Sequence, residues 1–157
     1  MSVQPFLIGE GWLQVRDGDD TGRAIFDRHY SRYHYADGRK PKLYAGPGEK
    51  MVLLRPDARA LFIWRRFISA DAQEGISCAV FRNEGQELSS TLVVEADALA
   101  DVRWPGERHY TYVNPRAVLS HNPGYCFLKA GWRRCGISKR RRLVILERPA
   151  NPLALAA

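Results

Sequence analysis

The sequence contains no run of about 18 apolar residues, which excludes a conventional membrane-spanning helix. It also lacks a charged N-terminal region followed by a long apolar one, so we expect no secretion signal. The three cysteines, Cys78, Cys126 and Cys135, form no C-x-x-C pair, and this argues against a cysteine-based zinc site. Such sparse, unpatterned cysteines are typical of a reducing compartment, and we expect a cytoplasmic protein without a membrane partner.

Apolar side chains, by contrast, are plentiful, because 45% of the 157 residues are hydrophobic and 11% are aromatic. A chain of this length and composition can bury one core, but it is too short for two full-sized domains. We therefore expect a single domain over residues 1–149. The short remainder, 150–157, is expected to be a loose C-terminal tail.

Acidic residues are scarce near the C-terminus, where most of the net charge of +7 is located. Residues 1–131 carry 17 Lys and Arg against 16 Asp and Glu, whereas residues 132–157 carry seven against one. A local basic patch suits a polyanion such as nucleic acid, although a solvated charged hairpin explains the same pattern. The candidate phosphate-binding residues of this region are Arg133, Arg134, Lys139, Arg140 and Arg141.

Hydrophobic periodicity and turn residues divide the chain into alternating strands and helices. Strands are predicted within residues 11–18, 49–57, 59–68, 75–85, 107–115, 133–138 and 141–148. Helices are predicted within residues 19–30, 86–104 and 122–132, and residues 31–48 are predicted to form a long loop. Because three strands precede the second helix, the order indicates an α/β domain with a mixed sheet and helices on its faces.

One segment, residues 26–50, combines two histidines, four tyrosines and six Lys or Arg residues. His29 can act as a general base or a metal ligand, because imidazole titrates near neutrality; alternatively it anchors the end of the first helix. Tyr30 is a candidate phenol donor or iron ligand, or it simply packs beside Phe26. Ser31 is a candidate substrate donor, or it caps the helix.

The rest of this segment interleaves aromatic rings with positive charges. Aromatic faces stack on unpaired bases while cations hold phosphates, which favours a single-stranded or flipped nucleic-acid substrate. The alternative is a solvated loop whose aromatic side chains pack onto the sheet. The candidate nucleic-acid-binding residues here are Arg32, Tyr33, Tyr35, Lys40 and Lys42.

The order of elements, together with Lys129, Gly131 and Trp132 near the last helix, resembles the GNAT superfamily of N-acyltransferases. The resemblance implies a mixed, mostly antiparallel central sheet flanked by helices. It also implies that the strand at 107–115 borders the catalytic cleft, which makes Tyr112 a candidate acid or ligand. A core aromatic residue is the alternative for Tyr112.

GNAT enzymes bind the pyrophosphate of acyl-CoA with a glycine-containing loop that opens a helix. Here the matching stretch is "RNEGQE", in which Arg82 and Gly85 fit the pattern, with Ser89 and Ser90 at the start of the next helix. Glu87 stands where Gly or Ala is expected, and its carboxylate would repel pyrophosphate. Ordinary use of acetyl-CoA is therefore doubtful, unless Glu87 turns outward as a helix-start residue.

The His29-Tyr30-Ser31 element on such a scaffold resembles the Mom-type DNA modification proteins of bacteriophage Mu and related phages. This resemblance implies modification of adenine in DNA, iron bound at His29 and Tyr30, and a phage or prophage protein in a bacterial host. The prediction is a transferase that places a small acyl or carbamoyl-like group on the adenine exocyclic amine. The alternatives are an acetyl-CoA-dependent N-acetyltransferase for a protein or small amine, and a non-catalytic nucleic-acid-binding protein. Each of these three functions is compatible with an oligomer.

Overall fold

The computed structural model describes residues 6–7, 11–29, 36–38, 41–69, 71–117 and 123–151. Its strands are Phe6–Leu7 (β1), Leu13–Val15 (β2), Glu49–Leu54 (β3), Ala60–Arg66 (β4), Ile76–Asn83 (β5), His109–Val113 (β6), Arg133–Ile137 (β7) and Val144–Arg148 (β8). Its helices are Asp20–Phe26 (α1), Ser89–Arg103 (α2) and Tyr125–Lys129 (α3). No helix in these ranges is long and apolar enough to cross a membrane.

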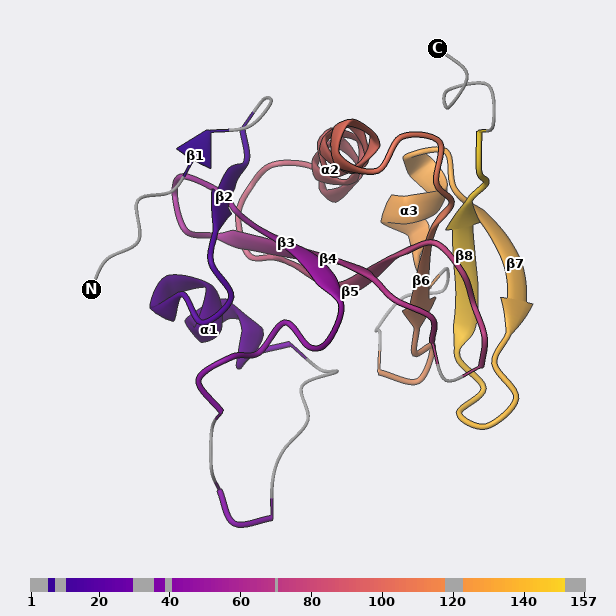
Figure 1. The fold of residues 1–157 in the computed structure, drawn as a ribbon, viewed down its shortest axis with the longest axis horizontal. Coiled ribbons are helices and arrows are strands. Elements are labelled where there is room, and N and C mark those ends of the chain that lie inside the picture. Colours follow the sequence, from indigo (N-terminus) through magenta and orange to yellow (C-terminus); the bar gives the residue numbers. More distant parts are fainter. Residues whose placement is uncertain are drawn as a thin grey trace.

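The strands form one eight-stranded sheet in the order β1-β2-β3-β4-β5-β6-β8-β7. Every neighbouring pair is antiparallel except β5 and β6, which run parallel because α2 connects them. The predicted mixed, mostly antiparallel sheet with flanking helices is therefore confirmed (Figure 1). The short strand β1 was not predicted from the sequence.

Each face of the sheet is covered by its own hydrophobic core. On one face, here called the α1 face, Ile25 of α1 packs with Val52, Ile63 and Val80. The opposite face, the α2 face, carries the larger core, which includes residues of α2, α3 and the strands. Figure 1 shows α1 below the sheet and α2 above it, so helices cover both faces.

A β-bulge interrupts β5 at Ala79. On the neighbouring strand β4, Ile63 pairs with Val80 and Trp64 pairs with Cys78, so Ala79 is an extra residue. Cys78 therefore packs in the α2-face core, whereas Val80 packs in the α1-face core. Bulges bend a strand and often occur beside functional sites.

Beyond this bulge, β5 and β6 separate. Their pairing covers only Ile76 to Cys78 of β5, although β5 stays paired with β4 as far as Asn83. The edge of β5 that faces β6 is consequently open from Ala79 onward. Figure 1 shows the two halves of the sheet, β2–β5 and β6–β8, running in clearly different directions.

A buried polar network joins α2, β6 and the segment before β7. Asp97 is 4% exposed, and one of its oxygens lies 2.7 Å from Nδ1 of the fully buried His109. The other oxygen accepts a hydrogen bond of 2.9 Å from Nε1 of Trp132. His109 and Thr111 share this face of β6, while Tyr110 and Tyr112 share the other, with ring centroids 5.9 Å apart.

Candidate functional site at the open end of β5

His29 is placed by the end of α1. The helix begins with Asp19, whose carboxylate accepts a hydrogen bond of 2.9 Å from the N–H of Gly22. The helix ends at Phe26, so the predicted helix within residues 19–30 is too long at its C-terminal end. His29 instead follows a tight turn in which its N–H donates to the carbonyl of Phe26 at 2.9 Å.

The turn brings the His29 imidazole to the open end of β5. Its pKa is lowered to about 4, mainly by burial and also by the positive charge of Arg82, while a hydrogen bond with the Phe81 backbone opposes both. The imidazole is therefore neutral at pH 7. A neutral imidazole can accept a proton or ligate a metal, so both roles predicted for His29 are chemically open to it.

Three charged side chains form an ion cluster beside this histidine. Glu84 accepts hydrogen bonds from Nη2 and Nε of Arg28, at 2.5 and 2.6 Å, and from Nε of Arg82, at 2.6 Å. The hydrogen bond from Arg28 is the main reason why the pKa of Glu84 falls to about 2. Arg82, predicted to bind a pyrophosphate, is thus already paired with a carboxylate of its own loop.

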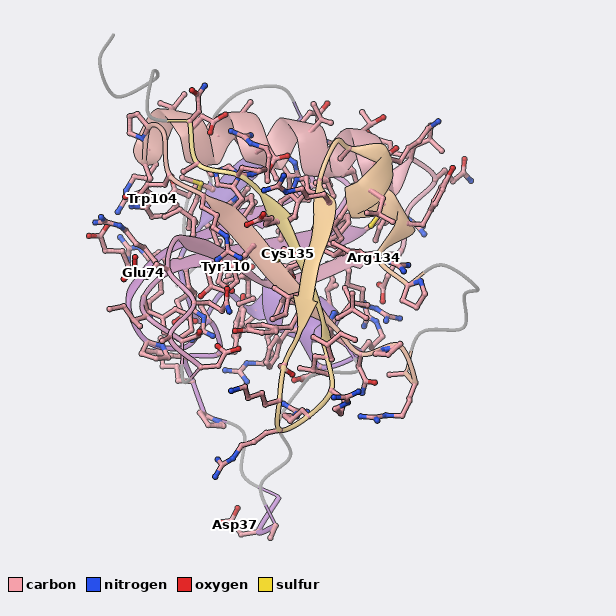
Figure 2. The ribbon with its side chains drawn as sticks, turned by 90° about the vertical axis from the view of Figure 1, so that its right-hand side faces the viewer. Asp37, Glu74, Trp104, Tyr110, Arg134 and Cys135 are labelled. Atoms are coloured by element: carbon pink, nitrogen blue, oxygen red, sulfur yellow. The ribbon has the colours of Figure 1, made fainter. Side chains whose placement is uncertain are left out.

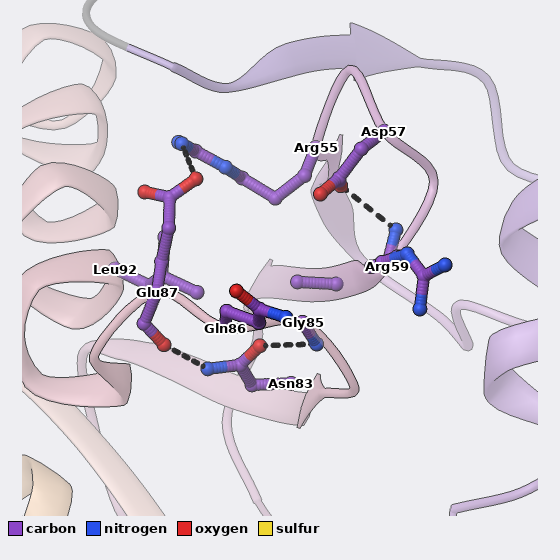
Figure 3. Close-up of a pocket in the computed structure, with 9 residues that line it drawn as sticks. Arg55, Asp57, Arg59, Asn83, Gly85, Gln86, Glu87 and Leu92 are labelled. Carbon is purple, nitrogen blue, oxygen red and sulfur yellow. Dashed lines mark hydrogen bonds and ion pairs between the residues drawn. The ribbon is translucent and has the colours of Figure 1, made fainter.

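Asn83 organises the loop between β5 and α2. Its amide oxygen accepts a hydrogen bond of 2.9 Å from the N–H of Gly85, and its Nδ2 donates to the Glu87 carbonyl at 2.7 Å (Figure 3). The same Nδ2 also donates to Ser89 Oγ at 3.0 Å. The Gly85 amide, which a bound phosphate would need, is occupied by these contacts. Residues of this loop and of the β3–β4 turn together line a small pocket.

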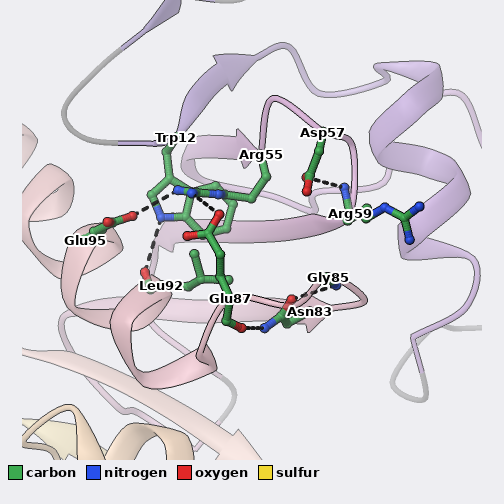
Figure 4. Close-up of polar contacts among 9 residues, drawn as sticks. All are labelled: Trp12, Arg55, Asp57, Arg59, Asn83, Gly85, Glu87, Leu92 and Glu95. Atoms are coloured by element: carbon green, nitrogen blue, oxygen red, sulfur yellow. Dashed lines mark hydrogen bonds and ion pairs between the residues drawn. The ribbon is translucent and has the colours of Figure 1, made fainter.

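Glu87 turns toward the β3–β4 turn and pairs with Arg55 (Figure 4). Arg55 also contacts Glu95 of α2 at 3.0 Å and lies over the ring of Trp12, 5.5 Å from its centroid. Trp12 in turn donates to the carbonyl of Leu92 at 3.2 Å. These contacts neutralise Glu87 and clamp the start of α2 against the β3–β4 turn.

Helix α2 begins at Ser89, as predicted, but neither Ser89 nor Ser90 is its N-cap. That position belongs to Leu88, which makes no side-chain capping bond. The β5–α2 loop therefore matches the acyl-CoA loop only in part, because Arg82 and the Gly85 N–H form hydrogen bonds within the loop, to Glu84 and Asn83. The residues present do not fit a bound pyrophosphate in the usual geometry.

Tyr112, the other predicted catalytic residue, is held by the β4–β5 loop. Its hydroxyl donates to Asp71 Oδ1 at 2.5 Å and lies 3.2 Å from Ser69 Oγ. Burial and the hydrogen bond to Asp71 both raise the pKa of Tyr112. The phenol is therefore a neutral group engaged with this loop.

The basic residues near the C-terminus divide into two kinds. Arg133 on β7 contacts Glu147 through Nε at 2.9 Å and Nη2 at 2.8 Å. The turn that follows β7 holds Lys139, Arg140, Arg141 and Arg142, all exposed, and the structure places no carboxylate of the described residues against them. Arg134 and Cys135 are exposed on β7, the edge strand at the front of Figure 2. Lys42 is exposed as well.

Several predicted site residues lie outside the described ranges: Tyr30, Ser31, Arg32, Tyr33, Tyr35 and Lys40. Their predicted roles stay predictions. Within the ranges that are described, no group of three or more His, Cys, Asp or Glu side chains could hold a metal ion. The iron site at His29 and Tyr30 therefore also stays a prediction.

The sequence analysis missed Arg28, Arg55, Asn83 and Asp71 as members of these clusters. Arg28 and Glu84 are 56 residues apart, and Arg55 and Glu87 are 32 apart, so no local spacing pairs them. Comparisons with protein families, with curated proteins and with solved structures found no match for this chain.

Proposed function

We propose that this chain is a transferase that modifies the exocyclic amine of a nucleobase, with adenine in DNA as the favoured target, on a GNAT-like scaffold. The observation that carries the proposal is the neutral His29 imidazole at the open end of β5. A parallel pair of strands that separates after a bulge provides backbone groups for a ligand at the same place.

The charge around this end of the sheet supports a polyanionic substrate. Arg28 and Arg82 both pair with Glu84, and Asp27 also acts on Arg28, so this cluster brings two guanidinium groups to the open end of β5. The turn at 139–142 lies at the end of the sheet where β6 ends, because Val144 at the start of β8 pairs with Val113 at the end of β6. Arg116, beyond β6, donates to the carbonyl of Arg141 at 2.9 Å and joins this basic turn to the end of β6. Phosphates of a bound strand would position the base without specifying sequence.

In the proposed reaction the amine nitrogen attacks the carbonyl carbon of an activated acyl or carbamoyl donor. The new N–C bond forms, the donor's leaving group departs with its electron pair, and the amine loses a proton. His29 accepts that proton at the ring nitrogen that is not bonded to Phe81. The target base must be unpaired or flipped out of the helix to reach the imidazole.

Neither implied cofactor is given a step in this reaction. The β5–α2 loop does not fit acyl-CoA in the usual geometry, because Arg82 and Gly85 bind within the loop. Iron, implied by the resemblance to Mom-type proteins, would have His29 as its one candidate ligand within the described ranges. The proton transfer above depends on the imidazole alone.

Nucleoside mass spectrometry tests the proposal. Plasmid DNA and total RNA are digested from bacteria that express the wild-type chain, His29→Ala or Val102→Ala, the last being a control at a residue that is 83% exposed on α2. We expect a new nucleoside with wild type and Val102→Ala, and none with His29→Ala. Persistence of the nucleoside with His29→Ala would refute the mechanism. An unmodified profile together with a rise in melting temperature on adding acetyl-CoA would favour an ordinary N-acetyltransferase instead.

A further inference from the structure

Two adjacent arginines on β4 have opposite surroundings. Arg66 lies on the α2 side of the strand, where it contacts Glu107 at 3.1 Å and Glu49 at 3.9 Å. Arg65 lies on the α1 face, because successive residues of a strand point to opposite sides. The pair thus offers a built-in comparison between an ion-paired guanidinium and its neighbour.

The Arg65 guanidinium is enclosed by apolar and backbone groups. Its central carbon lies 4.2 Å from the centroid of the Phe67 ring, and one terminal nitrogen lies against Gly46, whose φ is +90°. Its Nε is buried and has no hydrogen-bond partner. Burial lowers the pKa of Arg65, and Tyr110 is the ionisable group that acts on it.

No carboxylate of the described residues is paired with Arg65. Outside those ranges the chain has a single acidic side chain, Glu10. A partly buried cation that has an aromatic ring beside it but no anion is costly, and proteins normally pair such charges with anions. A cation kept at this cost is a candidate for an anionic ligand that the chain itself does not supply.

We infer that Arg65 is the centre of a binding site for a compact oxyanion, a phosphate or a carboxylate, on the α1 face of the sheet. The planar guanidinium fork matches both anions in size and geometry. In the strand register Arg65 pairs with Ser77, and Ser77 pairs with Tyr110, so two hydroxyl-bearing residues stand in one row with Arg65 on this face of the sheet. Hydroxyl groups can donate to an oxyanion.

The oxyanion site is separate from the His29 site but lies on the same side of the sheet. Arg65 pairs with Ser77 of β5, whereas His29 contacts Phe81, four residues further along the strand. Because Ala79 is bulged between them, that separation equals three residues of β4, from Arg65 to Phe62, or about 10 Å. The anion could belong to a phosphodiester of a nucleic-acid strand or to a small group donor, since both carry the same chemistry. The inference does not depend on the proposed function.

Titration with inorganic phosphate tests the inference, with melting temperature and calorimetric heat as readouts at constant ionic strength. At ten times its Kd, phosphate should raise the melting temperature of wild type and Arg66→Met by about 3 to 6 °C. Arg65→Met should abolish the rise. Arg65→Lys keeps the charge but loses the fork, so it should weaken phosphate binding about tenfold.

Arg65→Met should also melt at the same or a higher temperature without phosphate, because it removes a buried, unpaired charge at similar volume. If Arg65→Met gains stability and loses phosphate binding, Arg65 serves to bind a ligand rather than to stabilise the fold. Competition by a short single-stranded oligonucleotide would identify the phosphodiester as the source, and competition by a small carboxylate such as acetate alone would identify the donor. Equal phosphate responses in wild type and Arg65→Met, or none in either, would overturn the inference.

Discussion

Asp97 is the acceptor on which the buried polar network depends, and its removal should strongly destabilise the protein. Asp97→Ala leaves His109 Nδ1 and Trp132 Nε1 buried without their partner. Breaking a buried, hydrogen-bonded charge of this kind costs about 3–5 kcal/mol. Domains are stable by only about 5–15 kcal/mol, so this is a large share of the total.

For a chain of this size each kcal/mol corresponds to about 2–4 °C, so the melting temperature should fall by about 6–20 °C. Urea unfolding followed by tryptophan fluorescence, at pH 7, measures the free energy directly. Asp101, one turn further along α2, is the matched control, since it is more exposed and pairs with Arg148 at 2.5 Å. Asp101→Ala should cost no more than about 1 kcal/mol.

Asp97→Asn adds an internal check on this reasoning. The asparagine Oδ1 can still accept from Trp132 Nε1, but its Nδ2 can donate to His109 Nδ1 only if the imidazole carries its proton on Nε2 instead. Its cost should lie between those of Asp101→Ala and Asp97→Ala. If Asp97→Ala and Asp101→Ala are equally stable, the network does not hold α2, β6 and the β7 segment together as described.

Two further predictions concern charge. Replacing the four basic residues at 139–142 with glutamine should reduce the slope of log K against log salt concentration for nucleic-acid binding by about 3–4. Arg133→Gln should change this slope by less than about one, because Arg133 is already paired with Glu147. Fluorescence anisotropy at several salt concentrations measures both slopes. His29 has a folded-state pKa of about 4, below its ordinary value of 6.5, so the unfolded chain binds the extra proton and stability should fall as pH drops from about 6.5 to 4. Urea unfolding across this pH range should show a smaller loss of unfolding free energy in His29→Gln than in wild type, and an equal loss would contradict the burial of His29. Glu84 does not interfere with this test: its pKa is lowered to about 2, so its contribution to stability is lost only below about pH 4.5.

Local patterns in the sequence were enough to predict most of the sheet and the long helix. Alternation and turn residues located β3 to β8, and helical spacing located α2, because both signals come from burial of neighbouring residues. Strand β1, with two residues, is too short to produce a pattern.

The site was predicted less completely, because its contacts join residues far apart in sequence. His29 was identified from its unusual neighbours, yet its burial against Phe81 and Arg82 depends on how α1 packs on the sheet. Glu87 was expected to repel a phosphate, but nothing local indicates that Arg55 neutralises it. Ionic partners are fixed by tertiary packing, so composition shows that charges exist without showing which ones pair.

Because the bulge at Ala79 accompanies the opening between β5 and β6, this opening depends on the number of residues in β5 rather than on their identity. Substitutions at Cys78, Ala79 or Val80 change side chains but leave the extra residue in place. Loss of one residue there would put Cys78 and Val80 opposite Trp64 and Ile63 without a bulge, so Phe81 would keep its contacts with Phe62 and Phe127 but the bend that accompanies the opening would be lost. The segment should therefore tolerate changes of identity far better than changes of length, although it reads as an ordinary apolar run.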